Sequence, residues 1–123
     1  MSEIKFTKLV PNVFYIDIRD ALTTFVDCLG FTITHDEIKT HRPFCVIEKG
    51  ELRINLFEDA GLANEHHPEF RLVTEDIENV YNQISSKYPN LLHPNLNKVT
   101  LRPWGAREFA ITDKQLGIVI QQW

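Results

Sequence analysis

Side chains that could bind a small molecule are concentrated in one segment near the end of the chain. The segment 102–113 reads Arg-Pro-Trp-Gly-Ala-Arg-Glu-Phe-Ala-Ile-Thr-Asp, and it places Trp104 between a proline and a glycine. An indole in such a loop need not belong to a core, and it can stack on a planar ligand or on a cation. Glu108 could supply a carboxylate to a cationic group, or it could pair with Arg107 or Arg53.

Strand alternation supplies a second group of candidate ligand contacts. In the segment 52–57, the aliphatic side chains at even positions must pack under helices, whereas the odd positions are mixed and suit a partly polar cleft. The candidates on this face, and on the corresponding face of the second half of the chain, are Arg53, Asn55, Phe57 and Arg71. Phe44 is a further aromatic candidate, although a place in the core explains it equally well.

Metal-binding and nucleophilic motifs are weakly supported. Segment 65–69, with two histidines and two glutamates, is the one local cluster of metal-capable side chains, and we interpret it as a solvated loop. Cys28 lies on an apolar helix face and is interpreted as packing, while Cys45 lies in a predicted strand. Neither belongs to a Cys-His motif, and the sequence contains no Gly-x-Ser-x-Gly or phosphate-binding glycine loop. We therefore expect no metal, no cofactor and no catalytic residue.

Composition narrows the class of protein. The 123 residues include 13 Lys and Arg against 17 Asp and Glu, for a net charge of −4, and the basic residues are scattered, which argues against nucleic-acid binding. No apolar run approaches the ~18 residues of a membrane span. The first residues lack the apolar core of a secretory signal, and two cysteines make no disulfide framework. We expect a cytoplasmic globular protein.

The predicted elements repeat in two halves, each with the order βαβββ. The first half has a strand at 9–16, a helix capped by Asp17 and ended by Gly30, and strands at 31–36, 44–48 and 52–57. The second half has a strand at 70–73, a helix at 77–88 capped by Asp76, an extended segment at 91–101, and strands at 108–112 and 118–122. We expect one domain over 1–123, with modules at about 1–58 and 68–123 joined by a polar loop.

Two motifs resemble the vicinal-oxygen-chelate superfamily, which includes glyoxalase I, extradiol dioxygenases and bleomycin-resistance proteins. Residues 10–31, ending in Phe-Val-Asp-Cys-Leu-Gly-Phe, resemble the superfamily's first strand and capped helix. Residues 103–113 resemble the "P-W-G-x-R-E-F-x-x-x-D" segment of the bleomycin-resistance branch, although the proline that usually follows the aspartate is missing, so the final turn is expected to differ. The resemblance implies an α+β fold with curved mixed sheets around a cleft.

The resemblance also bears on metal binding and assembly. The superfamily's metal ligands would fall near Val10 or Pro11, among residues 69–71, and at or near Ile120, and of these positions only Glu69 could bind a cation. Many members are homodimers whose cleft is completed at the interface. Some exchange the N-terminal strand, and Pro11 lies where that hinge would be, although it could equally be an ordinary edge-strand proline.

Together these observations predict a metal-free protein that binds and sequesters a small aromatic or cationic molecule in a cleft at a homodimer interface. The bleomycin-resistance branch uses the tryptophan that matches Trp104 in its drug-binding groove, although Trp104 could instead cap the dimer interface. One alternative is a metal-dependent lyase or dioxygenase with an unusual ligand set around Glu69 and a histidine. Another is a protein-interaction module with a residual cleft.

Overall fold

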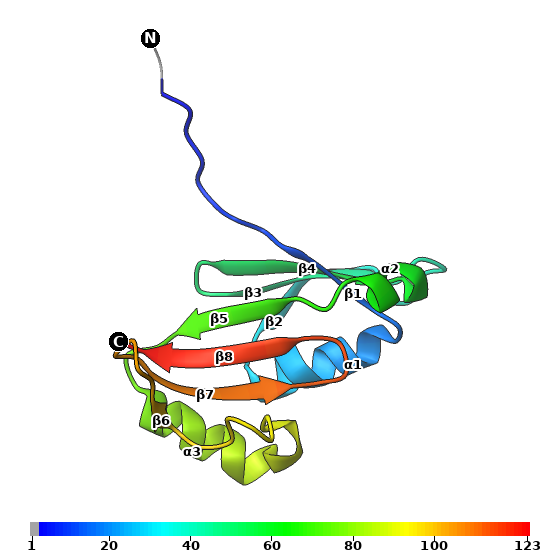
Figure 1. Cartoon of the computed structure of the whole chain (residues 1–123). Coiled ribbons are helices and arrows are strands. Elements are labelled where there is room, and N and C mark those ends of the chain that lie inside the picture. The colour runs from blue at the N-terminus through cyan, green and yellow to red at the C-terminus, as the bar shows by residue number, and fades with distance from the viewer. Residues whose placement is uncertain (1–2) are drawn as a thin grey trace.

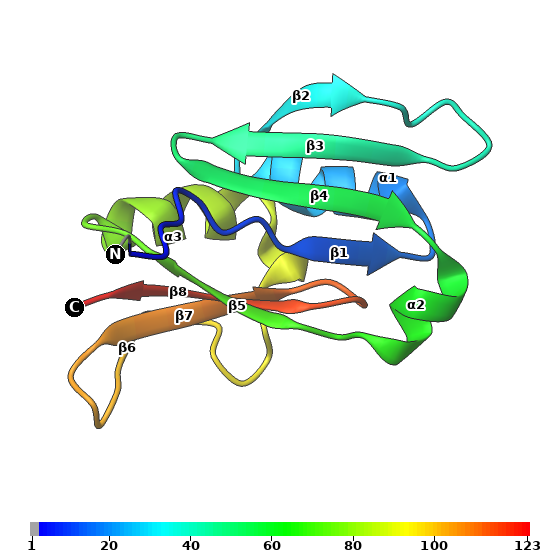
Figure 2. The same cartoon turned by 90° about the horizontal axis from the view of Figure 1, so that it is seen from above.

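The chain forms two four-stranded mixed sheets (Figures 1 and 2). The structure is a computed structural model, and it describes residues 3–123. The first sheet has the order β1-β4-β3-β2 and consists of β1 (Asn12–Tyr15), β4 (Leu52–Glu58), β3 (Phe44–Lys49) and β2 (Thr32–Asp36). The second has the order β5-β8-β7-β6 and consists of β5 (Glu69–Val73), β8 (Gly117–Gln122), β7 (Arg107–Thr112) and β6 (Thr100–Leu101). In each sheet the first pair is parallel and the others are antiparallel. The predicted α+β fold is confirmed.

One helix follows the first strand of each half. Helix α1 (Ile18–Leu22) begins where Asp17 accepts a hydrogen bond from the backbone N–H of Arg19, and it continues as the π-helical turn η1 (Thr23–Cys28). Gly30, at a φ of 79°, ends it as predicted. Helix α3 (Ile77–Lys87) has Asp76 at its N-cap position, but the prediction that the Asp76 side chain caps the helix is wrong.

The cap of α3 instead comes from the end of the chain. The side-chain oxygen of Gln122 accepts a hydrogen bond from the backbone N–H of Ile77 at 2.9 Å. This contact satisfies an orphan donor of the helix from a residue 45 positions away, so local sequence could not reveal it.

The core lies between the sheets and the helices. Strand alternation turns one face of each sheet toward the helices, and the buried side chains of both halves form one continuous cluster. Phe25 and Phe31 meet edge to face in this cluster, with ring centroids 5.7 Å apart. Burial of each such ring contributes about 1.5–3 kcal/mol. Figure 1 shows α3 beneath the second sheet. We call the face of each sheet that points away from the helices its open face.

Three segments differ from the sequence expectation. The segment predicted as a polar loop contains helix α2 (Ala60–Glu65), capped by Asp59 through the backbone N–H of Leu62. Most of the segment predicted as extended is irregular, with a short 3₁₀ turn η2 (Pro89–Leu91) before β6. Strand β1 begins at Asn12 rather than residue 9, because residues 3–10 form an arm that leaves the sheet (Figure 1).

A carboxylate at the final turn joins the two halves. Asp113 accepts hydrogen bonds from the hydroxyls of Tyr15, at 2.6 Å, and Thr24, at 2.7 Å, through one oxygen. Its other oxygen accepts from the backbone N–H groups of Gln115 and Leu116. Burial and then the charge of Asp113 raise the pKa of the Tyr15 phenol far above its ordinary value, so the phenol stays protonated and keeps donating.

In the described part of the chain, no helix has the length and apolar character needed to cross a membrane.

Candidate ligand-binding site

Trp104 lies in the tight loop that connects β6 to β7. Gly105 has a φ of 101°, which favours glycine, and its backbone N–H donates to the carbonyl of Arg102. The backbone N–H of Arg102 in turn donates to the carbonyl of Ala106, which closes the loop. The indole is 50% exposed at the tip of this loop. As predicted, Trp104 is outside the core and accessible to a ligand.

Glu108 lies under Trp104 on the open face of the second sheet, and it is 1% exposed. One of its oxygens, Oε2, accepts hydrogen bonds from Trp104 Nε1 at 2.8 Å, Gln121 Nε2 at 2.9 Å and Arg71 Nη1 at 3.2 Å. A buried carboxylate with three donors is stable where an unpaired one would be costly. The carboxylate therefore holds the indole in a fixed position.

Glu108 pairs with neither Arg107 nor Arg53, the two partners that the sequence suggested. Arg107 pairs with Glu78 of α3, and Arg53 lies by Glu48 of the neighbouring strand. Alternation along β7 explains why Arg107 is not the partner of Glu108, because residue 107 faces the helix, whereas residue 108 faces the open side.

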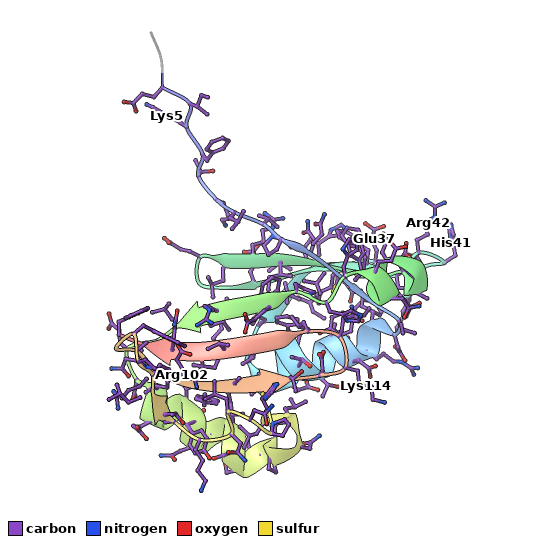
Figure 3. The ribbon with its side chains drawn as sticks, viewed as in Figure 1. Lys5, Glu37, His41, Arg42, Arg102 and Lys114 are labelled. Carbon is purple, nitrogen blue, oxygen red and sulfur yellow. The ribbon has the colours of Figure 1, made fainter. Side chains whose placement is uncertain are left out.

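Arg102 lies against both Glu108 and the indole. Its Nε is 3.9 Å from Glu108 Oε1, and its guanidinium carbon is 4.8 Å from the centre of the Trp104 ring, within range of a cation–π contact. Nε is buried, and the described residues offer it no hydrogen-bond partner. Figure 3 shows Arg102 at the end of the second sheet near the C-terminus, and Lys114 at the other end.

Two candidate residues, Phe57 and Phe44, form a row of stacked rings on the first sheet together with Phe14. Phe14, Phe57 and Phe44 come from the adjacent strands β1, β4 and β3, with centroid distances of 5.4 Å and 4.8 Å. All three rings are partly exposed. We call these three residues the aromatic row. Phe44 therefore belongs to an exposed face rather than to the core.

The polar candidates of β4 lie on the same face as the aromatic row. Asn55 donates to the side chain of Asn12 at 3.0 Å, and Ile54 and Leu56 are buried on the opposite face as alternation predicted. Leu52 departs from the prediction because it is 48% exposed at the hairpin end. A groove of about 840 Å³ runs between the arm, the start of β4 and β5, and both Arg53 and Arg71 line it.

The structure thus sorts the predicted residues into two groups. Trp104, Glu108 and Arg71 meet on the second sheet, and Phe44, Phe57, Asn55 and Arg53 share a face of the first. Three contributors were missed: Phe14, Arg102 and Gln121. Alternation within β1 and β8 could have indicated Phe14 and Gln121, whereas nothing in the sequence placed Arg102 against Trp104.

A divalent metal does not fit the residues at the positions where the resemblance would place its ligands. Ile120 is buried on the core face, and its neighbour on the open face is Gln121, which donates to Glu108. Arg71, facing the same side from β5, brings a positive charge to the place where a cation would be held. Glu69, His67 and His93 line one shallow pocket, but within residues 3–123 no three His, Cys, Asp or Glu side chains are grouped so as to hold a metal ion.

Burial disfavours the thiolate, which is the nucleophilic form, at both cysteines. Burial raises the pKa of Cys28 to about 11, and burial together with the charge of Asp36 raises that of Cys45 to about 11. Both are therefore protonated at neutral pH, which agrees with the packing interpretation of Cys28.

Comparison with known proteins supports the fold. The chain matches no family model and no curated protein sequence. Among solved structures, it is similar to a bleomycin-binding protein complexed with bleomycin, with a TM-score of 0.70 and 21% identity over 96% of this chain and 99% of that one. A glyoxalase/bleomycin resistance protein/dioxygenase superfamily member from Sphaerobacter thermophilus has a TM-score of 0.70 and 18% identity, covering 98% of each chain.

A third similar structure is a bleomycin resistance determinant encoded on the transposon Tn5. Its TM-score is 0.68 and its identity 22%, over 95% of this chain and 98% of that one. The resemblance to the bleomycin-resistance branch, stated from two sequence motifs, is thus confirmed as a shared fold over nearly the whole chain.

Proposed function

We propose that this protein binds a small planar molecule on Trp104 and sequesters it without transforming it. The observation that carries the proposal is the hydrogen bond from the half-exposed indole to the buried Glu108 carboxylate. An exposed aromatic ring that is already fixed in place loses little conformational freedom when a ligand stacks on it, which favours affinity. Several proteins of this fold are bleomycin-binding or bleomycin-resistance proteins, so bleomycin is one ligand to test.

We further propose that the working form is a cytoplasmic homodimer. Three large apolar side chains of the arm, Ile4, Phe6 and Leu9, are 85–87% exposed in the single chain. Apolar groups left in water in this way are typical of surfaces that a partner covers. Within one chain Trp104 and the aromatic row belong to different sheets, and a second copy could complete the cleft by bringing its aromatic row to Trp104.

The experiment uses untagged protein purified without chelator. Metal content is measured by plasma mass spectrometry, and bleomycin and planar aromatic compounds are then screened by thermal shift and calorimetry. We expect well below one metal per subunit, and saturable binding that Trp104→Ala reduces about tenfold or more. Trp123→Ala is the matched control, since Trp123 is the other tryptophan and is also exposed. A ligand that binds Trp104→Ala as tightly as wild type would refute the site.

Stoichiometric metal together with activity lost to a chelator would instead identify a metal enzyme, and would contradict the proposal.

A further inference from the structure

The charges around Trp104 favour a ligand of one sign. Two guanidinium groups, those of Arg71 and Arg102, lie against a single carboxylate, that of Glu108. The three side chains together carry a formal charge of +1. The surroundings of the indole are therefore positive, although the chain as a whole is negative.

The one negative group at this site is not available to a ligand. Glu108 is 1% exposed, and the hydrogen bonds that the described residues make to it all end on Oε2. A cationic ligand would have to displace an arginine or the indole N–H to reach the carboxylate. The sequence-based idea that Glu108 receives a cationic group therefore has no support in the geometry.

The positive groups, in contrast, are accessible and incompletely paired. The Arg71 side chain is 45% exposed and makes its hydrogen bond to Glu108 through Nη1. The Arg102 side chain is 33% exposed, its contact with Glu108 is 3.9 Å long, and no hydrogen-bond partner for its buried Nε lies within residues 3–123. A guanidinium with unused donors is suited to a carboxylate or a phosphate, because its planar fork can bind two oxygens at once.

We propose that the ligand is a planar aromatic anion, whose ring stacks on Trp104 while its carboxylate or phosphate is bound by Arg71 and Arg102. This inference rests on the proposed function, and it adds the chemical class of the ligand. The groove beside the site agrees with it, since the charged side chains that line the groove include three cations and two anions: Lys8, Arg53, Arg71, Glu51 and Glu69.

The test compares four naphthyl compounds of similar shape by calorimetry at low salt: the carboxylate, the phosphate, the neutral methanol and the methylammonium. We expect both anions to bind about tenfold or more tightly than the alcohol, and the ammonium to bind most weakly. The ratio of carboxylate to phosphate affinity then separates the two anion classes. Raising the ionic strength should weaken binding of the anions and leave the alcohol unchanged.

Arginine variants assign the effect to its residues. Arg102→Gln and Arg71→Gln should bring the affinity for the carboxylate down to that for the alcohol. Arg102→Gln is the milder change because its ion pair is the longer one. The matched control is Arg107→Gln, which removes a similarly exposed, paired arginine from the helix-facing side of β7, the strand that carries Glu108, and should change nothing.

Three outcomes would overturn the inference. If all compounds bind equally and binding needs Trp104, the anion preference is wrong and aromatic capture stands. Tightest binding of the ammonium likewise refutes the preference alone. If none of the four binds, the inference fails, and the bleomycin screen then decides whether capture on Trp104 fails with it.

Discussion

The indole N–H of Trp104 donates to the buried Oε2 of Glu108 at 2.8 Å, so an exposed ring is anchored on an internal charge. The same oxygen accepts from Gln121 and Arg71. Residues from the loop and from β5, β7 and β8 thus meet at one atom, and the ring's position depends on all of them. We call the Glu108 carboxylate the anchor of the ring. Both the anchor and the ring can be tested by substitution.

Replacing the anchor should reduce stability in a graded way. Glu108→Ala leaves the indole N–H, Gln121 and Arg71 without their acceptor and removes the carboxylate that lies against Arg102, and we expect a loss of about 2 kcal/mol or more in the free energy of unfolding by urea. Glu108→Gln keeps an acceptor and should cost less. Glu78→Ala removes the exposed partner of Arg107 and should cost under about 0.5 kcal/mol. Equal stability of Glu108→Ala and Glu78→Ala would refute the role of the carboxylate.

The contact between the halves at Asp113 can be tested in the same way. Asp113→Ala removes the acceptor that the buried hydroxyl of Thr24 and the phenol of Tyr15 share, so we expect a loss of about 2–3 kcal/mol in unfolding free energy. Tyr15→Phe removes one of the two hydroxyl donors and should cost about 1 kcal/mol. Thermal and urea unfolding measure both. An Asp113→Ala protein as stable as wild type would show that this carboxylate does not join the halves.

Alkylation kinetics test the state of the thiols. With a pKa near 11, rather than the usual 9.0, Cys28 and Cys45 carry about a hundredfold less thiolate at mildly alkaline pH. Iodoacetamide should therefore modify the folded protein slowly, and the rate should rise as the pH approaches 11. The urea-unfolded chain is the control and should react at the ordinary rate. Fast modification of the folded protein at neutral pH would contradict the protonated state.

The arm provides a test of the dimer. Deleting residues 3–9 should shift the protein from dimer to monomer in light scattering coupled to gel filtration, because the deletion removes three exposed apolar side chains. A variant with Ile4, Phe6 and Leu9 all changed to serine keeps the arm's length and should have the same effect. If wild type is a monomer, or both variants stay dimeric, the arm does not cover an interface.

Much of the fold could be predicted because its signals are local. Ile18 and Ile77, which are 59 residues apart, each begin a helix, as the repeated βαβββ order indicated, and each helix lies between strands of the expected order. Helix α2 was missed, since its six residues are too few to show an apolar period. The cap of α3 was assigned to Asp76, because a distant side chain such as Gln122 leaves no trace in the local sequence.

The site was predicted as a set of residues but not as a network. Alternation correctly put Arg71 on an open face, and the loop chemistry around Trp104 correctly indicated an exposed ring. The partners of Glu108 could not be predicted, because they depend on which strands are neighbours and on how the β6–β7 loop folds back. Register and loop closure are properties of the assembled sheet, so the charge character of the site followed only from the structure.

The most direct test of the central claim is a titration followed through the two indole N–H signals in a proton–nitrogen correlation spectrum. The chain has two tryptophans, so the indole N–H signal that remains in Trp123→Phe is assigned to Trp104. On addition of naphthalene carboxylate to the wild-type protein, the Trp104 signal should shift and saturate while that of Trp123 stays in place. If the compound binds by calorimetry and the Trp104 signal does not move, the ligand is not held on Trp104.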